Sequence, residues 1–386
     1  MAEAARLIGL PLAALVCLAT ALLLSLYGTP LAARAALRFG IVDLPDGSLK
    51  RHRGPVPYLG GLAVYGSFIL TMALVFDFDQ RVLGLLLAGT ILVLLGLVDD
   101  FGVLGVGPKF LGQAFATVVL IKSGIAIQIG MLPEWANLAL TALWIVGITN
   151  ALNIIDIMDG LAAGVAVIAA AFMLIISCVN SDTSIALMTA TLIGSLLGFL
   201  RYNVHPAQIF LGDTGSLFVG MMLGALAMIG KYDAVNSVGW LTPLLILAVP
   251  IFDTLFVMTL RAARRSNPFK GSPDHFALRL RRAGLPAPRV VMLTWILASA
   301  MGCLGMFNVA VEATMSLMLV AGAAGALVIC GAALLRLPEA PAPEPRGDAE
   351  PDLHVMFESA DPDVADMHER AMVRQAQRNL ERWRRR

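Results

Sequence analysis

Long apolar runs recur along the whole chain, and they limit what it can fold into. "LLLAGTILVLLGLV" and "VIAAAFMLII" are two of them. A helix crosses the hydrocarbon core of a bilayer with about 20 such residues, and it satisfies its own backbone hydrogen bonds there. Because 58% of the residues are hydrophobic and only 14% are charged, one soluble core cannot account for the sequence. We therefore predict an all-α, polytopic transmembrane helical bundle.

The apolar runs predict about eleven membrane spans. We place them at 7–28, 59–76, 82–98, 110–128, 138–153, 161–179, 184–200, 209–229, 237–260, 290–309 and 313–336. The first run is long for a signal peptide and lacks a convincing cleavage pattern, so we expect it to be a retained helix. A net charge of +1 and the lack of an extended basic patch argue against nucleic-acid binding.

Lys and Arg residues are distributed unevenly between the loops. Loops must alternate between the two sides of the membrane, and nearly all of these residues fall in one set, which is 29–58, 99–109, 154–160, 201–208 and 261–289. The positive-inside rule assigns this set to the cytoplasm. The sequence therefore predicts a protein of the inner (cytoplasmic) membrane, with its polar clusters and its tail facing the cytoplasm.

Three regions are expected along the chain. Residues 1–336 form the transmembrane domain, 337–362 a linker rich in Pro and Glu, and 363–386 a basic tail helix ending in "ERWRRR". A basic terminus is attracted to anionic lipid at the inner leaflet. A solvated charged helix explains the same pattern equally well.

Asp99 and Asp100 end the third predicted span, in "LGLVDDFGVLG". Adjacent carboxylates at a helix C-terminus oppose the helix dipole and repel each other. A polar stop signal is the simpler interpretation, but Lys or Arg would serve that purpose better. The pair therefore indicates a cation nearby.

"NALNIIDIMDG" closes the fifth span with Asn150, Asn153, Asp156 and Asp159 spaced three residues apart. Residues at positions i and i+3 are neighbours on a helix, so these side chains form a polar ladder along one flank. Helix-stop groups are an alternative, but four polar groups in an apolar background favour a functional site.

Asp213 precedes the eighth span in "NVHPAQIFLGDTGSLFVG". By itself it is best explained as an N-cap, with Thr214 and Ser216 opening the helix. Gly212 and Gly215 also leave backbone amides accessible, which suits a phosphate at a helix N-terminus.

Acidic groups from three separate loops are thus expected on one face of the membrane. They are Asp99, Asp100, Asp156, Asp159 and Asp213, accompanied by the basic residues Lys50, Lys109 and Arg261. Hard oxygen ligands suit Mg²⁺ or Mn²⁺. Acidic clusters with basic phosphate clamps are what phosphoryl transfer requires.

Four motifs in this order resemble the polyprenyl-phosphate N-acetylhexosamine-1-phosphate transferase superfamily, over residues 40–335. They are "KRHRGPVPYLGG", "VDDFGVLGVGPKFLGQ", "NALNIIDIMDGLAAG" and "FLRYNVHPAQIFLGDTGS". The second motif includes Gln113. The first loop looks more like the UDP-N-acetylglucosamine branch than the muramoyl-pentapeptide branch.

The resemblance implies an enzyme in which a lipid phosphate attacks the β-phosphate of a UDP-N-acetyl sugar. The products are a lipid diphospho-sugar and UMP, and the step initiates cell-envelope glycan synthesis. The lipid is expected to be undecaprenyl phosphate, and the chain is expected to pair as a homodimer.

The resemblance also implies roles for individual residues. Asp99, Asp100 and Asp213 are the expected catalytic residues, and Asp213 and Asp100 the expected metal ligands. The residues expected to bind substrate are Lys50, Lys109, Asn153, Asp156, Asp159, Gly212 and His275.

Two departures from the family pattern bear on the donor sugar. Ile157 stands where the first Asp-Gly of the paired motif has glycine. In the last cytoplasmic loop His275 aligns with the first histidine of a His-x-His-His motif, while Ala277 and Leu278 occupy the other two histidine positions. The donor sugar is therefore left open.

Three alternatives are compatible with parts of the pattern. A transporter would place acids near the bilayer midplane, whereas these acids gather at one boundary. An alcohol phosphotransferase with a CDP-linked donor shares the acid-rich "DIMDG", but lacks the Ala-Arg expected after it. A catalytically diverged scaffold of the same fold is the third.

Overall fold

The structure is a computed structural model that describes residues 9–43, 56–76, 78–102, 104–130, 132–232, 237–265 and 274–337. The predicted linker and tail beyond residue 337 lie outside these residues, as does Lys50.

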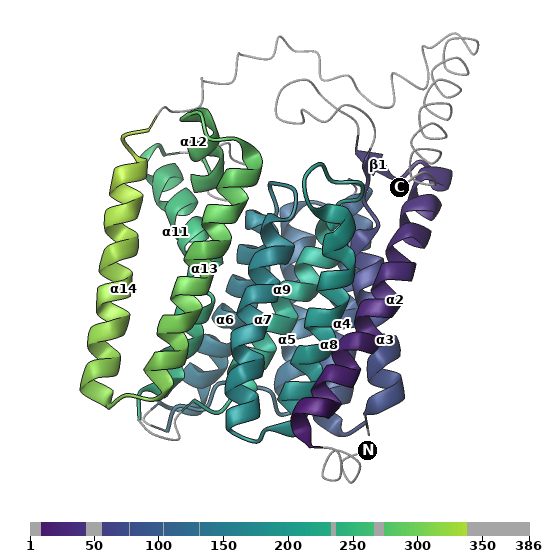
Figure 1. The fold of residues 1–386 in the computed structure, drawn as a ribbon. Coiled ribbons are helices and arrows are strands. Elements are labelled where there is room, and N and C mark those ends of the chain that lie inside the picture. The colour runs from purple at the N-terminus through teal and green to yellow at the C-terminus, as the bar shows by residue number, and fades with distance from the viewer. Residues whose placement is uncertain are drawn as a thin grey trace.

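Helices account for almost all of the described secondary structure (Figure 1). They are α2 (Leu10–Phe39), α3 (Gly60–Val75), α4 (Gln80–Asp100), α5 (Val106–Lys122), α6 (Glu134–Ile155), α7 (Leu161–Val179), α8 (Thr183–Asn203), α9 (Gly212–Ile229), the short η1 (Gly239–Leu241) and α10 (Thr242–Ile246), α11 (Ala248–Ala263), α12 (Phe276–Arg282), α13 (Ala287–Val309) and α14 (Ala313–Leu334). Strands β1 (Val42–Asp43) and β2 (Val56–Pro57) pair antiparallel. The predicted all-α bundle is confirmed.

The number of membrane spans differs from the expectation of about eleven. Within the described ranges, eight helices are long and apolar enough to cross a membrane, or nine if the pair bent by 69° between η1–α10 and α11 counts as one span. Every predicted run is helical, but the run 237–260 is divided among η1, α10 and α11, and α3 has only 16 residues and α5 only 17. Hydropathy locates an apolar run, whereas the length of its helix depends on where the flanking turns begin.

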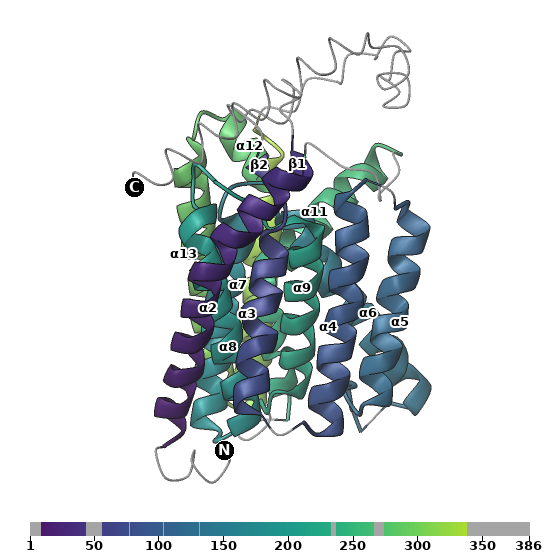
Figure 2. The same cartoon turned by 90° about the vertical axis from the view of Figure 1, so that its right-hand side faces the viewer.

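The centre of the bundle is formed by α8 and α9. In their most apolar windows 78% and 83% of the residues are buried, against 22% in α2 and 17% in α14. Close contact of α2 with α8 depends on glycine, because a Cβ on Gly194 would lie 2.2 Å from the carbonyl oxygen of Leu18. The hydroxyl of Ser25 donates to the Ser195 carbonyl across this contact, at 2.6 Å. Figure 2 shows α2 crossing the outside of the bundle.

One end of the bundle collects the segments that carry the acidic motifs. α4 and α6 end there and α5 and α9 begin there, together with α12 and the β1–β2 pair (Figures 1 and 2). The alternation of spans predicted from the sequence therefore brings these loops to the same side of the molecule.

Replacing Gly194 by Ala should lower the melting temperature in detergent, because the added methyl group pushes α2 away from α8 at the Leu18 carbonyl. The matched control is Gly66→Ala in α3, where nothing lies within 4 Å of the added Cβ. This control should be neutral or stabilising, since Ala is favoured over Gly inside helices. Equal melting temperatures for the two variants would contradict the packing account.

Candidate active site at one end of the bundle

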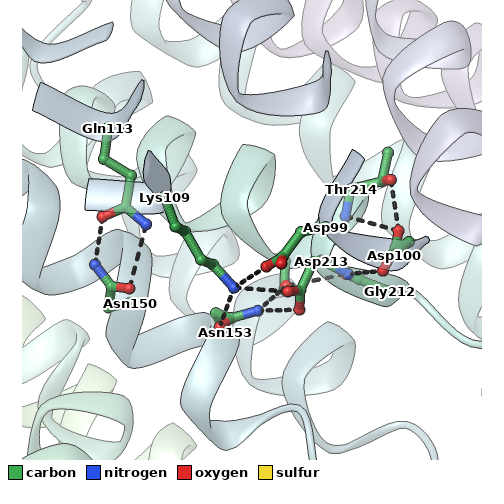
Figure 3. Close-up of polar contacts among 10 residues, drawn as sticks. Asp99, Asp100, Lys109, Gln113, Asn150, Asn153, Gly212, Asp213 and Thr214 are labelled. Carbon is green, nitrogen blue, oxygen red and sulfur yellow. Dashed lines mark hydrogen bonds and ion pairs between the residues drawn. The ribbon is translucent and has the colours of Figure 1, made fainter. Parts of the chain in front are cut away.

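Asp100, the last residue of α4, binds the start of α9. Its Oδ1 accepts a hydrogen bond from the Asp213 amide at 2.7 Å, and its Oδ2 accepts from the Thr214 amide at 3.1 Å and the Thr214 hydroxyl at 2.6 Å (Figure 3). A carboxylate at a helix N-terminus satisfies free amides and complements the helix dipole. Asp100 thus caps a helix far away in sequence, a role that sequence analysis did not foresee.

Glycines let three backbones meet at this turn. A Cβ on Gly96 of α4 would lie 2.5 Å from the carbonyl of Asp213, and one on Gly61 would lie 2.2 Å from the amide nitrogen of Gly215. Gly212 has a φ of +71° in the left-handed region, which favours glycine. The Gly-Gly of "PYLGG" and Gly96 are therefore needed for close approach.

The first loop docks on the same turn through its backbone. The Phe210 amide donates to the Pro57 carbonyl at 2.9 Å, the Gly60 amide to the Phe210 carbonyl at 3.1 Å, and the Gly61 amide to the Leu211 carbonyl at 2.9 Å. These bonds hold the segment just before Asp213 in place.

Lys109, in the first turn of α5, places its ammonium between two carboxylates. Its Nζ lies 2.5 Å from Asp99 Oδ2 and 2.6 Å from Asp213 Oδ2, and 3.4 Å from the side-chain oxygen of Asn153. The amide of Asn153 donates to Asp213 Oδ1 at 2.6 Å and to the Ser216 hydroxyl at 2.9 Å. Residues from α4, α5, α6 and α9 are thus brought into one polar cluster (Figure 3).

The backbone amides at the start of α9, which the sequence predicts as phosphate contacts, are partly used by hydrogen bonds within the protein. Two of the amides there, those of Asp213 and Thr214, already donate to Asp100. Gly212 lies against the Asp100 carboxylate, since a Cβ on it would be 2.7 Å from Oδ2. A role for Gly212 in substrate binding stays a prediction.

Asp159 is held by the loop before α9. Its Oδ2 accepts from the Ala207 amide at 3.0 Å and lies 2.8 Å from His205 Nδ1. The side chain of Asn203 completes the connection by accepting from the Gly160 amide at 3.0 Å. These contacts fix the turn that follows α6, and a substrate contact of Asp159 stays a prediction.

Asp156 follows the last residue of α6 and lies near the acidic cluster. Burial raises its pKa to about 8, and three neighbouring carboxylates add to the shift. They belong to Asp213, Asp100 and Asp159. A carboxyl group with this pKa is largely protonated at neutral pH and can donate a hydrogen bond.

His275 lies at the start of α12, away from the contacts just described. Its Nδ1 is 2.7 Å from Asp253 Oδ2 of α11, and the Phe276 amide donates to Asp253 Oδ1 at 3.1 Å. Asp253 is fully buried. Sequence analysis missed this residue, although a lone carboxylate within the apolar run "AVPIFDTLF" is a signal for a partnered polar group.

The two positions without histidine differ in burial. Ala277 is fully buried in the core, and Leu278 is half-buried. The neighbouring buried cation, Arg279, pairs with Asp274 at 3.3 Å. Within the described part of this loop, His275 is the single histidine, and its role in substrate binding stays a prediction.

The donor atoms at the cluster fit the divalent metal expected from the sequence. No three His, Cys, Asp or Glu side chains of the described residues form a ready-made metal cage. Mg²⁺ commonly binds through one or two carboxylates together with substrate phosphates, so such a cage is not required. Asp99 and Asp213 already share one cation, the Lys109 ammonium. Oxygen ligands in this arrangement suit Mg²⁺ or Mn²⁺ bound with a diphosphate.

Replacing Asp100 by Ala should lower the free energy of unfolding by about 1–3 kcal/mol, because three donors of α9 lose their acceptor. Asp100→Asn keeps one acceptor oxygen and should lose less. Thermal denaturation in detergent measures both variants. An Asp100→Ala protein as stable as the wild type would contradict the capping role.

The raised pKa of Asp156 predicts a pH-dependent stability. A carboxyl group whose pKa is higher in the folded chain than in the unfolded chain favours folding while it is protonated, and this contribution is lost as pH rises through the folded value of about 8. The melting temperature of the wild type should therefore fall relative to Asp156→Asn between about pH 5 and about pH 9. A difference that is constant over this range would contradict the shift.

Comparison with known proteins places the chain in a family. A model of "Glycosyl transferase family 4" matches residues 82–231, which include all residues of the polar cluster. A probable undecaprenyl-phosphate N-acetylglucosaminyl 1-phosphate transferase of Bacillus subtilis (strain 168) is 34% identical, over 76% of this chain and 83% of its own length. A decaprenyl-phosphate N-acetylglucosaminephosphotransferase of Mycolicibacterium smegmatis is 31% identical, over 72% and 77%.

A relative from the muramoyl-pentapeptide branch is also similar to this chain. The phospho-N-acetylmuramoyl-pentapeptide-transferase of Caldicellulosiruptor bescii is 30% identical over 67% of this chain and 85% of its own length. The similarity to both branches, together with the polar cluster and the multi-pass helical bundle, confirms the resemblance inferred from the four motifs. The chain belongs to the polyprenyl-phosphate N-acetylhexosamine-1-phosphate transferase superfamily.

Proposed function

We propose that the chain transfers N-acetylglucosamine-1-phosphate from UDP-N-acetylglucosamine to undecaprenyl phosphate or another polyprenyl phosphate. The products are a lipid diphospho-sugar and UMP. The observation that carries the proposal is the cluster in which one ammonium, that of Lys109, is shared by the carboxylates of Asp99 and Asp213. The activities for which the relatives are named support this acceptor and this sugar.

The site would face the cytoplasm. The loops at its end of the bundle are those in which the sequence concentrates Lys and Arg, which the positive-inside rule assigns to the cytoplasm. UDP-sugars are soluble and charged, while a polyprenyl phosphate keeps its phosphate at the membrane surface. A site where helices end at the bilayer boundary is accessible to both.

The reaction forms one P–O bond and breaks another. An oxygen of the lipid phosphate attacks the β-phosphorus of the UDP-sugar, and UMP leaves with the electrons of the broken bond. Little base catalysis is needed, because a phosphate oxygen is already ionised at neutral pH. The residues of the cluster would therefore act chiefly by positioning and by stabilising charge.

Lys109 would contact the diphosphate during the reaction. Its ammonium is shared by two carboxylates, so it can turn from one of them to a phosphate oxygen while remaining close to the other. Asn153 holds Asp213 from the other side and fixes its orientation. Asp156 in its protonated form can donate a hydrogen bond to the nucleotide sugar.

Asp213 and Asp99 are the residues that would hold Mg²⁺ or Mn²⁺, with the side-chain oxygen of Asn153 nearby. When bound, the metal ion neutralises charge that develops on the diphosphate. Asp100, predicted from the sequence as a ligand, uses both carboxylate oxygens to cap α9, and we therefore favour Asp99 in its place.

Purified protein with Mg²⁺ should release UMP from UDP-N-acetylglucosamine only when a polyprenyl phosphate is added. Asp213→Asn should lower turnover by about 10³-fold or more, because it weakens both metal binding and the contact with Lys109. Single-turnover assays with labelled donor measure the loss. Asp182→Asn, at the N-cap of α8, is the control and should retain activity.

Assays with a series of UDP-N-acetyl sugars as donors distinguish the proposed reaction from the alternatives. Release of UMP from a different UDP-N-acetyl sugar would keep the reaction class and correct the sugar. No UMP from any donor would overturn the proposal in favour of a scaffold or a transporter. Full activity of Asp213→Asn would remove this residue from the metal site.

A further inference from the structure

A second pair of polar side chains joins α5 to α6, one helical turn further into the bundle than the polar cluster. Gln113 lies four residues after Lys109, and Asn150 lies three residues before Asn153. Gln113 Nε2 donates to Asn150 Oδ1 at 3.2 Å, and Asn150 Nδ2 donates to Gln113 Oε1 at 2.5 Å. The two amides therefore bind each other reciprocally, parallel to the contact between Lys109 and Asn153 (Figure 3).

The burial of this amide pair makes its hydrogen bonds dependent on how α5 is aligned with α6. The side chain of Gln113 is 1% exposed, and Asn150 also donates to the Val146 carbonyl of its own helix at 2.7 Å. Away from water, an amide left without a partner is costly, so the two side chains favour one register of α5 against α6. Side-chain hydrogen bonds between membrane helices stabilise their association, so the pair also favours contact of α5 with α6.

α5 packs on α4 as well as on α6, but few of its residues are enclosed. Only four of its residues are buried, Gln113, Ala116, Thr117 and Leu120, whereas Leu111 and Phe115 are 73% and 60% exposed. Small apolar contacts of this kind permit rotation and sliding of a helix, because they are nearly equivalent over neighbouring registers. The reciprocal amide pair does not permit this, since both hydrogen bonds would be lost.

We infer that Gln113 and Asn150 are positioning residues, which set the register of α5 on α6 and thereby place the Lys109 ammonium between Asp99 and Asp213. The inference rests on the proposed transfer reaction. The short contacts of Lys109 leave little tolerance, because its Nζ must reach Asp99 and Asp213 on two other helices. A displacement of about 1 Å at such a site can lower a rate by about 10²-fold.

Gln113→Leu and Asn150→Leu should each lower kcat by about 10- to 100-fold and change KM for the UDP-sugar much less, because the misplaced ammonium acts mainly on the transition state. A double variant exchanges the two residues, Gln113→Asn with Asn150→Gln. It keeps one glutamine and one asparagine side chain at the contact and should recover most of the lost activity. The matched control is Asn308→Leu, which removes another buried interhelical amide contact, that to Thr242 and Ser316. It should lower the melting temperature without lowering kcat of the folded protein.

A double-mutant cycle with Lys109→Met separates positioning from general stability. In the Lys109→Met background, Gln113→Leu should change the single-turnover rate by less than about twofold, because the group that it positions is already absent. A full multiplicative loss in both backgrounds would overturn the inference, as would wild-type kcat in Gln113→Leu. Failure of the exchange variant to recover activity while remaining folded would also overturn it.

UMP-release assays of the wild type and of Gln113→Leu test the positioning role separately from the proposed function. A wild-type protein that releases no UMP from any donor overturns the function, and the positioning role is lost with it. An active wild type with an equally active Gln113→Leu overturns the positioning role alone.

Discussion

The contact between the end of α4 and the start of α9 is the constraint on which the site depends. Asp100 binds two amides and a hydroxyl of α9, and Gly96 lets the two backbones approach closely enough for those bonds to form. Asp99 and Asp213 are each adjacent to a residue in this contact. Once α4 and α9 are joined, the two carboxylates face the same space, which only a cation can occupy favourably.

Lys109 supplies that cation from a third helix. Three carboxylates gathered at the edge of an apolar bundle would repel one another strongly, because charges interact over longer distances where water is excluded. One ammonium shared by Asp99 and Asp213 offsets this repulsion, and the bonds of Asp100 to α9 offset the rest. The arrangement gathers both signs of charge at one end of the bundle, which suits the proposed diphosphate substrate.

The central and peripheral helices contribute differently. α8 and α9 are enclosed by other helices, so packing fixes most of their length, and the hydrogen bonds from Asp100 add to it at the start of α9. α5 packs on α4 and α6 but has only four buried residues, and the Gln113–Asn150 pair adds a contact that depends on register. α11 follows a sharp bend and carries Asp253, whose carboxylate fixes His275 and the start of α12. Buried polar pairs therefore determine geometry where apolar contacts are too few or too uniform to do so.

The sequence by itself determined the class of fold, the end of the molecule where the acids gather and the family, because apolar run length and motif order are local properties. It also predicted that Asp99, Lys109 and Asp213 gather on one face, and the structure brings these three side chains together with Asn153. Only the tertiary structure decided that Asp100 caps α9, that Gly96 and Gly61 serve close approach, and that Asp253 binds His275. These roles depend on contacts between helices distant in sequence. Residue spacing carries no information about which carboxylate of an adjacent pair turns toward the shared Lys109 ammonium and which turns toward a neighbouring backbone.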